Sequence, residues 1–417
     1  MAPPAVRWIT GTLEDAGFAT WAVGGAVRDA LLGHPMGDWD LATRAHPKQV
    51  RRLFRRTVPL GVEHGTVGVL SDDGVMYEVT TFRRDVETDG RHATVAFADT
   101  VEEDLARRDF TINAVAWHPL RQEMLDPFGG VEDLERGVLR AVGDPSQRFA
   151  EDHLRILRAL RFASRFRLTV EGDTWEALAR AVGHLPSLSA ERIREELLKV
   201  LDADAAPSRA LGLYGTSGAL AVLYPELAAL ADAGGDAWDR ALATVDRLPR
   251  ARPLLRLAAL LRPLHPRDAA QVLVRLKLSN AQTDETSRRA GAPALPAAGA
   301  SDADVRRWLA AVGPERLAAV ARLDLAEARG RGREAAAAVV DAWRRARRVV
   351  DTRPPLTVGE LALDGRDLIR LGLRPGPRFG RLLDELLEWV LEDPARNRRQ
   401  ALEEEALRRA GEGAGDG

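Results

Sequence analysis

The sequence predicts an α+β chain made of a mixed strand-and-helix head followed by a remainder that is helical throughout. Up to about residue 145, short apolar runs alternate with glycine-containing turns. Residues 66–70 and 75–82 read as paired strands, because Asp72-Asp73-Gly74 between them is a turn sequence. Beyond Gly143-Asp144-Pro145, apolar residues recur every three or four positions, which is the period of an α-helix. A length of 417 residues also favours more than one domain.

In the head, the apolar pattern predicts a first helix, a short buried strand that ends at Gly24-Gly25, and a second helix that stops at Gly33. A break at Asp126–Gly130 precedes a further short helix. These elements cover residues 8–16, 19–23, 27–32 and 131–136.

The remainder shows helical periodicity in successive stretches and no internal repeat of fixed period. The predicted helical stretches are residues 154–166, 175–182, 193–201, 255–262, 304–328 and 333–350.

Composition excludes several classes of protein. The chain has no cysteine, which removes disulfide frameworks, zinc fingers and thiolate nucleophiles. No apolar run reaches the roughly 18 residues of a membrane span, and the first ten residues lack a signal-peptide pattern. We therefore expect a cytoplasmic protein without a membrane partner. With a net charge of −2, any RNA binding must come from local basic patches.

The first chemical motif combines Gly24-Gly25 and Arg28 with the pair Asp38 and Asp40. Two glycines between a strand and a helix let backbone amides approach a triphosphate, and Arg28 offers a guanidinium to it. Two carboxylates at i and i+2 on a strand share one face and suit Mg²⁺. Alone, a glycine pair is usually a turn and Asp-x-Asp a solvated loop, so the combination carries the prediction.

Two further motifs lie downstream. The segment 107–114 has two interpretations. In one, Arg108 reaches a triphosphate while Asp109 and Asn113 orient the site. In the other, the arginines form a plain surface ion pair with Asp109. In the segment 151–161, predicted as one helix, three arginines spaced by three residues share a face. The same helix also has a leucine face suited to a core.

Together with the segment 191–196, these motifs resemble, in order, those of class II tRNA nucleotidyltransferases. This family contains the CCA-adding enzymes and the bacterial poly(A) polymerases. A weaker similarity to single-chain CCA-adding enzymes continues at 359–368. The resemblance implies a polymerase-β-like nucleotidyltransferase head (1–145), a helical neck with base recognition (146–210), a helical RNA-binding body (211–350) and a helical tRNA-binding tail (351–410). The Gly-rich end (411–417) is expected to be disordered.

The resemblance also assigns site residues. It implies that Asp38 and Asp40 are catalytic and bind Mg²⁺, and that Asp152 and Arg155 select the base. The residues implied to bind the nucleotide are Gly25, Arg28, Arg108, Asn113, Asp152, Arg155, Arg158 and Arg161.

Base selection by Asp152 and Arg155 also follows from hydrogen-bonding chemistry. Cytosine and adenine each place an amino donor beside a ring-nitrogen acceptor, so a carboxylate and a guanidinium accept both. Guanine and uracil place a carbonyl where the amino group should be, and Asp152 would repel it. Side chains can thus replace a nucleic-acid template.

Two assignments stay open at this level. Glu78 is either a third carboxylate of the metal site or a solvent-facing residue of an alternating strand. The segment 191–196 is expected to stabilise the helices that carry the base-reading residues, without taking part in the chemistry.

The expected activity is Mg²⁺-dependent addition of the 3′-terminal CCA to tRNA from CTP and ATP. A flexible-loop-like segment at 83–95 argues against an enzyme that adds only the two cytidines, but Ala93 replaces a proline common in CCA-adding members. An enzyme that adds only A, or a poly(A) polymerase, is therefore the alternative, and a non-catalytic RNA-binding homologue the third. The expected partner is tRNA, gripped at its acceptor stem and TΨC arm. No obligatory protein partner is evident.

Overall fold

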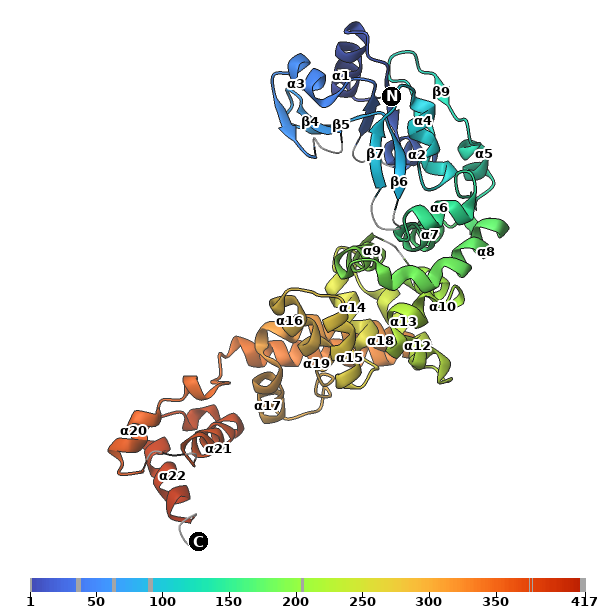
Figure 1. Cartoon of the computed structure of the whole chain (residues 1–417). Helices are drawn as coiled ribbons and strands as arrows, with labels where there is room; N and C mark the ends of the chain where they lie inside the picture. The colour runs from blue at the N-terminus through green and yellow to red at the C-terminus, as the bar shows by residue number, and fades with distance from the viewer. Residues whose placement is uncertain are drawn as a thin grey trace. The chain divides into compact units, whose positions relative to one another are not determined.

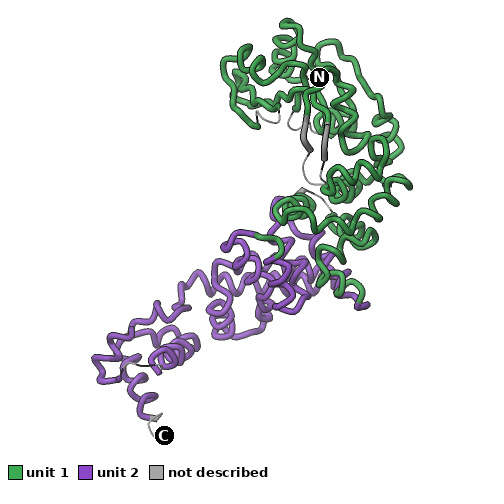
Figure 2. The backbone as a smooth tube through the Cα atoms, viewed as in Figure 1, with its two compact units in different colours: residues 1–232, 275–277 green, residues 233–274, 278–417 purple. Residues whose placement is uncertain are grey.

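A computed structural model describes residues 2–34, 39–61, 65–88, 93–203, 206–374, 376 and 378–412. The chain divides into two compact units, residues 1–232 with 275–277 and residues 233–274 with 278–417 (Figure 2). In the described ranges, no helix has both the length and the apolar character needed to cross a membrane.

The first unit contains a seven-stranded mixed sheet in the order β3-β4-β5-β2-β1-β8-β9. Its strands β4 and β5 are labelled in Figure 1. Strands β2 and β5 run parallel, and the other five pairings are antiparallel. The strands are β1 (Thr20–Val23), β2 (Asp40–Thr43), β3 (Thr57–Pro59), β4 (Thr66–Leu70), β5 (Met76–Thr81), β8 (Ala116–Trp117) and β9 (Met124–Leu125).

One face of this sheet packs against α1 (Pro4–Asp15) and α3 (Pro47–Leu53). Alternate strand residues such as Leu41 and Val79 join this core, because successive side chains point to opposite faces. The opposite face contributes Ala42 to a second core against α4 (Val101–Ala106). Asp40, two residues before Ala42, therefore lies on this second face.

The remaining strands of the first unit form two small pairs. Strands β6 (Arg83–Thr88) and β7 (Ala93–Phe97) make an antiparallel hairpin, and β10 (Val138–Leu139) pairs in parallel with β11 (Thr169–Val170). The segment resembling the family's flexible loop is this hairpin. Its residues 89–92 lie outside the described residues.

The helices of this unit confirm the predicted change from mixed to helical structure. Besides α1, α3 and α4 they are α2 (Gly25–Leu31), α5 (Gly130–Glu135), α6 (Pro145–Glu151), α7 (Leu154–Arg165), α8 (Gly172–Ala181), α9 (Ala190–Ala203), α10 (Pro207–Thr216), α11 (Ala219–Leu223) and α12 (Pro225–Asp232), with 3₁₀ turns at Thr111–Asn113 and Val182–Ser187.

The prediction of one continuous helix over 151–161 is wrong. Helix α6 ends at Glu151, Asp152 has extended backbone (φ −152°, ψ 105°), and α7 begins at Leu154. The Asp152 carboxylate accepts a hydrogen bond from the Leu154 amide at 3.0 Å. Aspartate favours such local bonds at helix starts over a helix interior, which explains the break.

The second unit is helical in its described part. Its helices are α13 (Ala237–Arg247), α14 (Pro253–Leu261), α15 (Pro266–Arg275), α16 (Asn280–Ala290), α17 (Asp302–Val312), α18 (Leu317–Arg331), α19 (Arg333–Asp351), α20 (Gly365–Arg370), α21 (Arg378–Glu392) and α22 (Arg399–Glu412), with 3₁₀ turns at Pro314–Arg316, Val358–Glu360 and Pro394–Arg396.

The predicted helical stretch at 304–328 is helical and comprises two helices, α17 and α18, because Gly313 has a positive φ of 92° and Pro314 follows it. The predicted domain boundaries at 145, 210 and 350 stay predictions. The predicted disordered end begins inside α22, and residues 413–417 lie outside the described part.

Candidate active site

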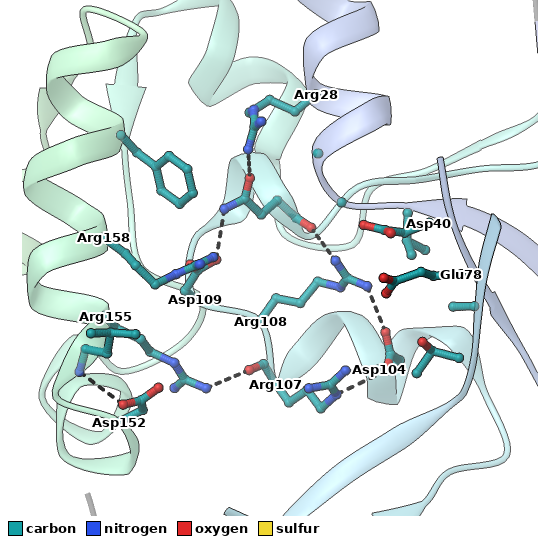
Figure 3. Close-up of a pocket in the computed structure, with 18 of the residues that line it drawn as sticks. Arg28, Asp40, Glu78, Asp104, Arg107, Arg108, Asp109, Asp152, Arg155 and Arg158 are labelled. Carbon is teal, nitrogen blue, oxygen red and sulfur yellow. Dashed lines mark hydrogen bonds and ion pairs between the residues drawn. The ribbon is translucent and has the colours of Figure 1, made fainter. Parts of the chain in front are cut away.

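A polar cavity of about 620 Å³ opens on the second face of the sheet, between the sheet and helices α7 and α9. In Figure 3 the Asp40 and Glu78 carboxylates lie on one side of the cavity, and Asp152 and Arg155 lie on the other. Asp40 and the eight residues predicted to bind the nucleotide all line it, namely Gly25, Arg28, Arg108, Asn113, Asp152, Arg155, Arg158 and Arg161.

The carboxylate end is set by strand register. Asp40 of β2 and Glu78 of β5 are direct partners in the parallel pairing, so both side chains leave the sheet on the cavity face. Glu78 is exposed, as an alternating strand requires, and its exposed face is also the cavity face. Thr80, which bonds Thr66 at 3.0 Å, continues this face. The solvent-facing strand position predicted for Glu78 is therefore also a position at which it can join the carboxylates of the cavity.

Two hard carboxylate oxygen donors side by side suit Mg²⁺, which commonly takes one or two carboxylates plus substrate phosphates. Within the described ranges no group of three or more potential ligands gathers, and Asp38 lies outside those ranges. Asp40 and Glu78 thus fit a divalent cation that is completed by phosphate oxygens.

Gly24 shapes the cavity beside these carboxylates. Its backbone has φ 73° and ψ −131°, which favours glycine. A β-carbon there would also come within 2.8 Å of the Arg108 Nη1 atom. Glycine therefore lets a guanidinium and the β1–α2 turn approach each other closely.

The Arg108 guanidinium is held from two sides. Its Nη2 donates to Asp104 at 3.1 Å, and its Nη1 donates to the Asn113 carbonyl at 3.3 Å. Asp104 is buried and also accepts two bonds from Arg107. Burial by itself would raise the pKa of Asp104, but the charges of Arg108 and Arg107 lower it overall. Arg108 is thus fixed at the cavity wall by a stably ionised carboxylate.

A chain of hydrogen bonds runs from α2 to α7. Arg28 Nη1 donates to Asn113 at 2.6 Å, and the Asn113 amide donates to Asp109 at 2.9 Å. Asp109 accepts from Arg158 Nε at 2.7 Å. Burial would raise the pKa of Asp109, yet Arg158 and Asn113 lower it to about 2. Asp109 and Asn113 therefore orient arginines at two places in the cavity, and the surface-pair alternative for Asp109 is wrong.

The Arg28 guanidinium already contacts several groups of the protein. Its side chain is 7% exposed, it donates twice to Asp29, and its guanidinium lies 4.3 Å from the Phe166 ring centroid. Burial lowers its pKa, although Asp29 opposes this. Its contact with phosphate stays a prediction.

At the opposite end, Asp152 and Arg155 have different partners. Arg155 donates to Glu151 and to the backbone carbonyls of Arg148 and Arg107, both at 3.0 Å. The Asp152 carboxylate instead pairs with Arg192 of α9 at 2.8 Å. The two predicted base readers are therefore held by different partners, Arg155 by α6 and the Arg107 carbonyl and Asp152 by α9.

The face of three arginines on α7 is present, and its members pair with different elements. Arg158 bonds Asp109, and Arg161 bonds the buried Glu196 of α9 at 2.7 Å. This pair and the one between Arg192 and Asp152 agree with a stabilising role for the segment 191–196.

Sequence reasoning missed several residues that line the cavity. Arg165 could have been found, since it continues the arginine face of α7 by one turn. Asp104, Thr66 and Thr80 carry no local pattern, because strand pairing and helix packing bring them in. Arg192 lies in the segment 191–196, which was expected to stabilise helices and not to line the cavity.

Family models match most of the chain. Residues 20–140 match "Poly A polymerase head domain", residues 167–230 match "Probable RNA and SrmB- binding site of polymerase A", and residues 255–406 match tRNA nucleotidyltransferase domain 2. Fold, cavity and models thus define a nucleotidyltransferase.

Comparison with individual relatives identifies the family within the nucleotidyltransferases. The CCA-adding enzyme of Limosilactobacillus fermentum is 35% identical over 97% of this chain and 96% of its own length. That of Lactobacillus delbrueckii is 37% identical over 94% of each. The crystal structure of the Bacillus stearothermophilus CCA-adding enzyme in complex with CTP is 32% identical, covers 100% of both chains and has a TM-score of 0.78. The chain belongs to the CCA-adding enzyme family.

Proposed function

We propose that this protein adds the 3′-terminal CCA to tRNA, taking CMP and AMP from CTP and ATP and releasing pyrophosphate. The observation that supports the proposal is one cavity lined by the Asp40 and Glu78 carboxylates at one end and by Asp152 and Arg155 at the other. Relatives of nearly the same length are CCA-adding enzymes, which supports it further.

At the carboxylate end, Asp40 and Glu78 would hold Mg²⁺, together with Asp38, which stays a prediction. Bound there, Mg²⁺ supplies positive charge that activates the attacking hydroxyl and stabilises the leaving pyrophosphate. The RNA 3′-oxygen forms a bond to the α-phosphorus, and the bond between that phosphorus and the bridging oxygen of the pyrophosphate breaks.

The triphosphate lies along the β1–α2 turn in this proposal. Gly24 and Gly25 let it approach the backbone, and Arg108 and Arg28 face it with fixed guanidinium groups. Because Asp104 and Asn113 hold Arg108, that side chain loses little conformational freedom when phosphate arrives. These residues position the α-phosphate next to Asp40.

Base choice falls to Asp152 and Arg155. The carboxylate accepts the exocyclic amino group of cytosine or adenine, and the guanidinium donates to the adjacent ring nitrogen. Uracil and guanine leave both groups unpaired or opposed, which is a strong basis for rejection. Arg158 and Arg161 support the nucleotide between the two ends.

The partners follow from the same proposal. The matched RNA-binding and second tRNA nucleotidyltransferase models, at 167–230 and 255–406, support tRNA binding through the helical part. We propose contacts with the backbone of the acceptor stem and TΨC arm. A reaction on tRNA in the cytoplasm agrees with the cysteine-free composition.

One experiment separates the possible activities. Purified protein is incubated with tRNAs that lack all three, the last two or the last of the CCA nucleotides, each with labelled CTP, ATP or both. We expect extension of the first substrate to complete CCA and then arrest. Addition of A to the CC-ended tRNA alone would identify an A-adding enzyme, and a long A tail a poly(A) polymerase. No addition to any substrate would refute the proposal.

A further inference from the structure

Asp152 is held by a guanidinium from another helix. Arg192 of α9 places its Nη2 atom 2.8 Å from Oδ2 and 3.1 Å from Oδ1 of the Asp152 carboxylate. The Asp152 side chain is 27% exposed and the Arg192 side chain 29%, and both line the cavity. Asp152 lies 40 residues earlier, in the break between α6 and α7. The start of α7 holds one carboxylate oxygen through the Leu154 amide, and α9 holds both through Arg192.

These contacts restrict what Asp152 can accept. A carboxylate has about four acceptor positions, two on each oxygen. Oδ1 accepts from the Leu154 amide and from Arg192, and Oδ2 accepts from Arg192. Among the described contacts, one acceptor position remains on Oδ2. That is the number needed for a single amino hydrogen of a base.

We propose that Arg192 is a positioning residue for base selection, which orients the Asp152 carboxylate so that its remaining acceptor meets the amino group of cytosine or adenine. The inference rests on the proposed function and names a residue that sets the specificity of that site. Without Arg192 the carboxylate keeps the Leu154 amide bond on Oδ1, and Oδ2 can turn away from a uracil or guanine carbonyl instead of opposing it. Arg192 thus keeps the Asp152 carboxylate opposed to the carbonyl oxygen of uracil or guanine.

The position of Arg192 separates it from the purely structural residues of α9. Glu196 is 1% exposed and pairs with Arg161, while Leu197 and Leu201 pack in the core. Arg194, two residues on, donates to the backbone carbonyls of Leu276 and Lys277 and does not line the cavity. Removing Arg192 therefore leaves the buried face of α9 intact.

The test compares Arg192→Ala and Arg192→Lys with the matched control Arg194→Ala. Calorimetry measures binding of CTP, UTP, ATP and GTP without tRNA, and single-nucleotide incorporation measures kcat and KM on a tRNA lacking CCA. For Arg192→Ala we expect the preference for CTP over UTP, and for ATP over GTP, to fall about tenfold or more, the size of one charged hydrogen bond. Arg192→Lys keeps a positive charge and should recover part of the preference.

Arg194→Ala should keep the wild-type preference, with thermal unfolding recorded for every variant. An equal loss of affinity for all four nucleotides in Arg192→Ala would show a merely structural role and overturn the inference, as would an unchanged preference. If Arg192→Ala does not fold, Arg192→Lys decides on the same criterion. If the wild type binds CTP and ATP selectively but incorporates neither, the proposed function fails while the binding preferences still decide the role of Arg192.

Discussion

Asp109→Asn tests the hydrogen-bonded chain that connects α2 with α7. The Asp109 carboxylate is 7% exposed and accepts from Asn113 and Arg158. An amide of the same shape keeps the volume but removes the charge. We expect lower stability at neutral pH and a lower kcat/KM, because Arg158 and Asn113 lose the group that orients them.

The size and pH dependence of the effect follow from the pKa of Asp109. Burial raises it, but Arg158 and Asn113 lower it from the ordinary 3.8 to about 2. At about 1.4 kcal/mol for each pKa unit, the ionised carboxylate stabilises the fold by about 2 kcal/mol. A depressed pKa gives stability that is present above the unfolded value and lost as the pH falls through the folded one. Roughly half should be lost between pH 5 and pH 3.

The assay is urea unfolding followed by tryptophan fluorescence at pH 5, 4 and 3, for wild type, Asp109→Asn and the control Glu176→Gln. Glu176 pairs with Arg180 on the surface, where both side chains are at least 65% exposed. Its variant should change the free energy of unfolding by less than about 0.5 kcal/mol. The difference between wild type and Asp109→Asn should shrink by about 1 kcal/mol from pH 5 to pH 3. A difference that stays constant over this range would refute the linkage.

Four further substitutions distinguish the two ends of the cavity. Asp40→Ala should abolish incorporation but leave tRNA binding, measured by filter retention, nearly unchanged; retained turnover would exclude the metal assignment. Asp152→Ala and Arg155→Ala should raise UMP and GMP incorporation relative to CMP and AMP in single-turnover assays, and unchanged rejection would exclude side-chain base reading. Gly24→Ala introduces backbone strain of about 1–3 kcal/mol and displaces Arg108, so kcat/KM for CTP and ATP should fall together, by about tenfold or more. A selective loss of one nucleotide would contradict the placement of the triphosphate.

The sequence predicted the fold well where a local period or turn decides it. The strand pair at 66–70 and 76–81 and the helix at 154–165 are present, because alternation and three-to-four spacing are local properties. It also predicted that Asp40 and the eight nucleotide-binding candidates share one cavity, since the ordered motifs imply a family whose members place them together. The sequence did not predict how the side chains inside the cavity pair with one another.

Asp152 shows why. The pattern of residues 151–161 is that of a helix, and only the bond from the Leu154 amide to the Asp152 carboxylate reveals the break. Its partner Arg192 lies on a helix whose packing depends on the whole unit. A contact between residues 40 positions apart leaves no periodic signal in either segment.

The tripeptide Arg107-Arg108-Asp109 explains how one short motif serves both ends of the cavity. The Arg107 carbonyl accepts from Arg155 at 3.0 Å, the Arg108 side chain lies against Gly24, and the Asp109 carboxylate holds Arg158. Consecutive residues thus fix the spacing between the phosphate-facing and base-facing groups. Moving this backbone would shift both ends at once, because peptide geometry is rigid. Substitutions that move this backbone should therefore alter rate and base choice together, whereas variants of Gly24 and Asp152 separate the two effects.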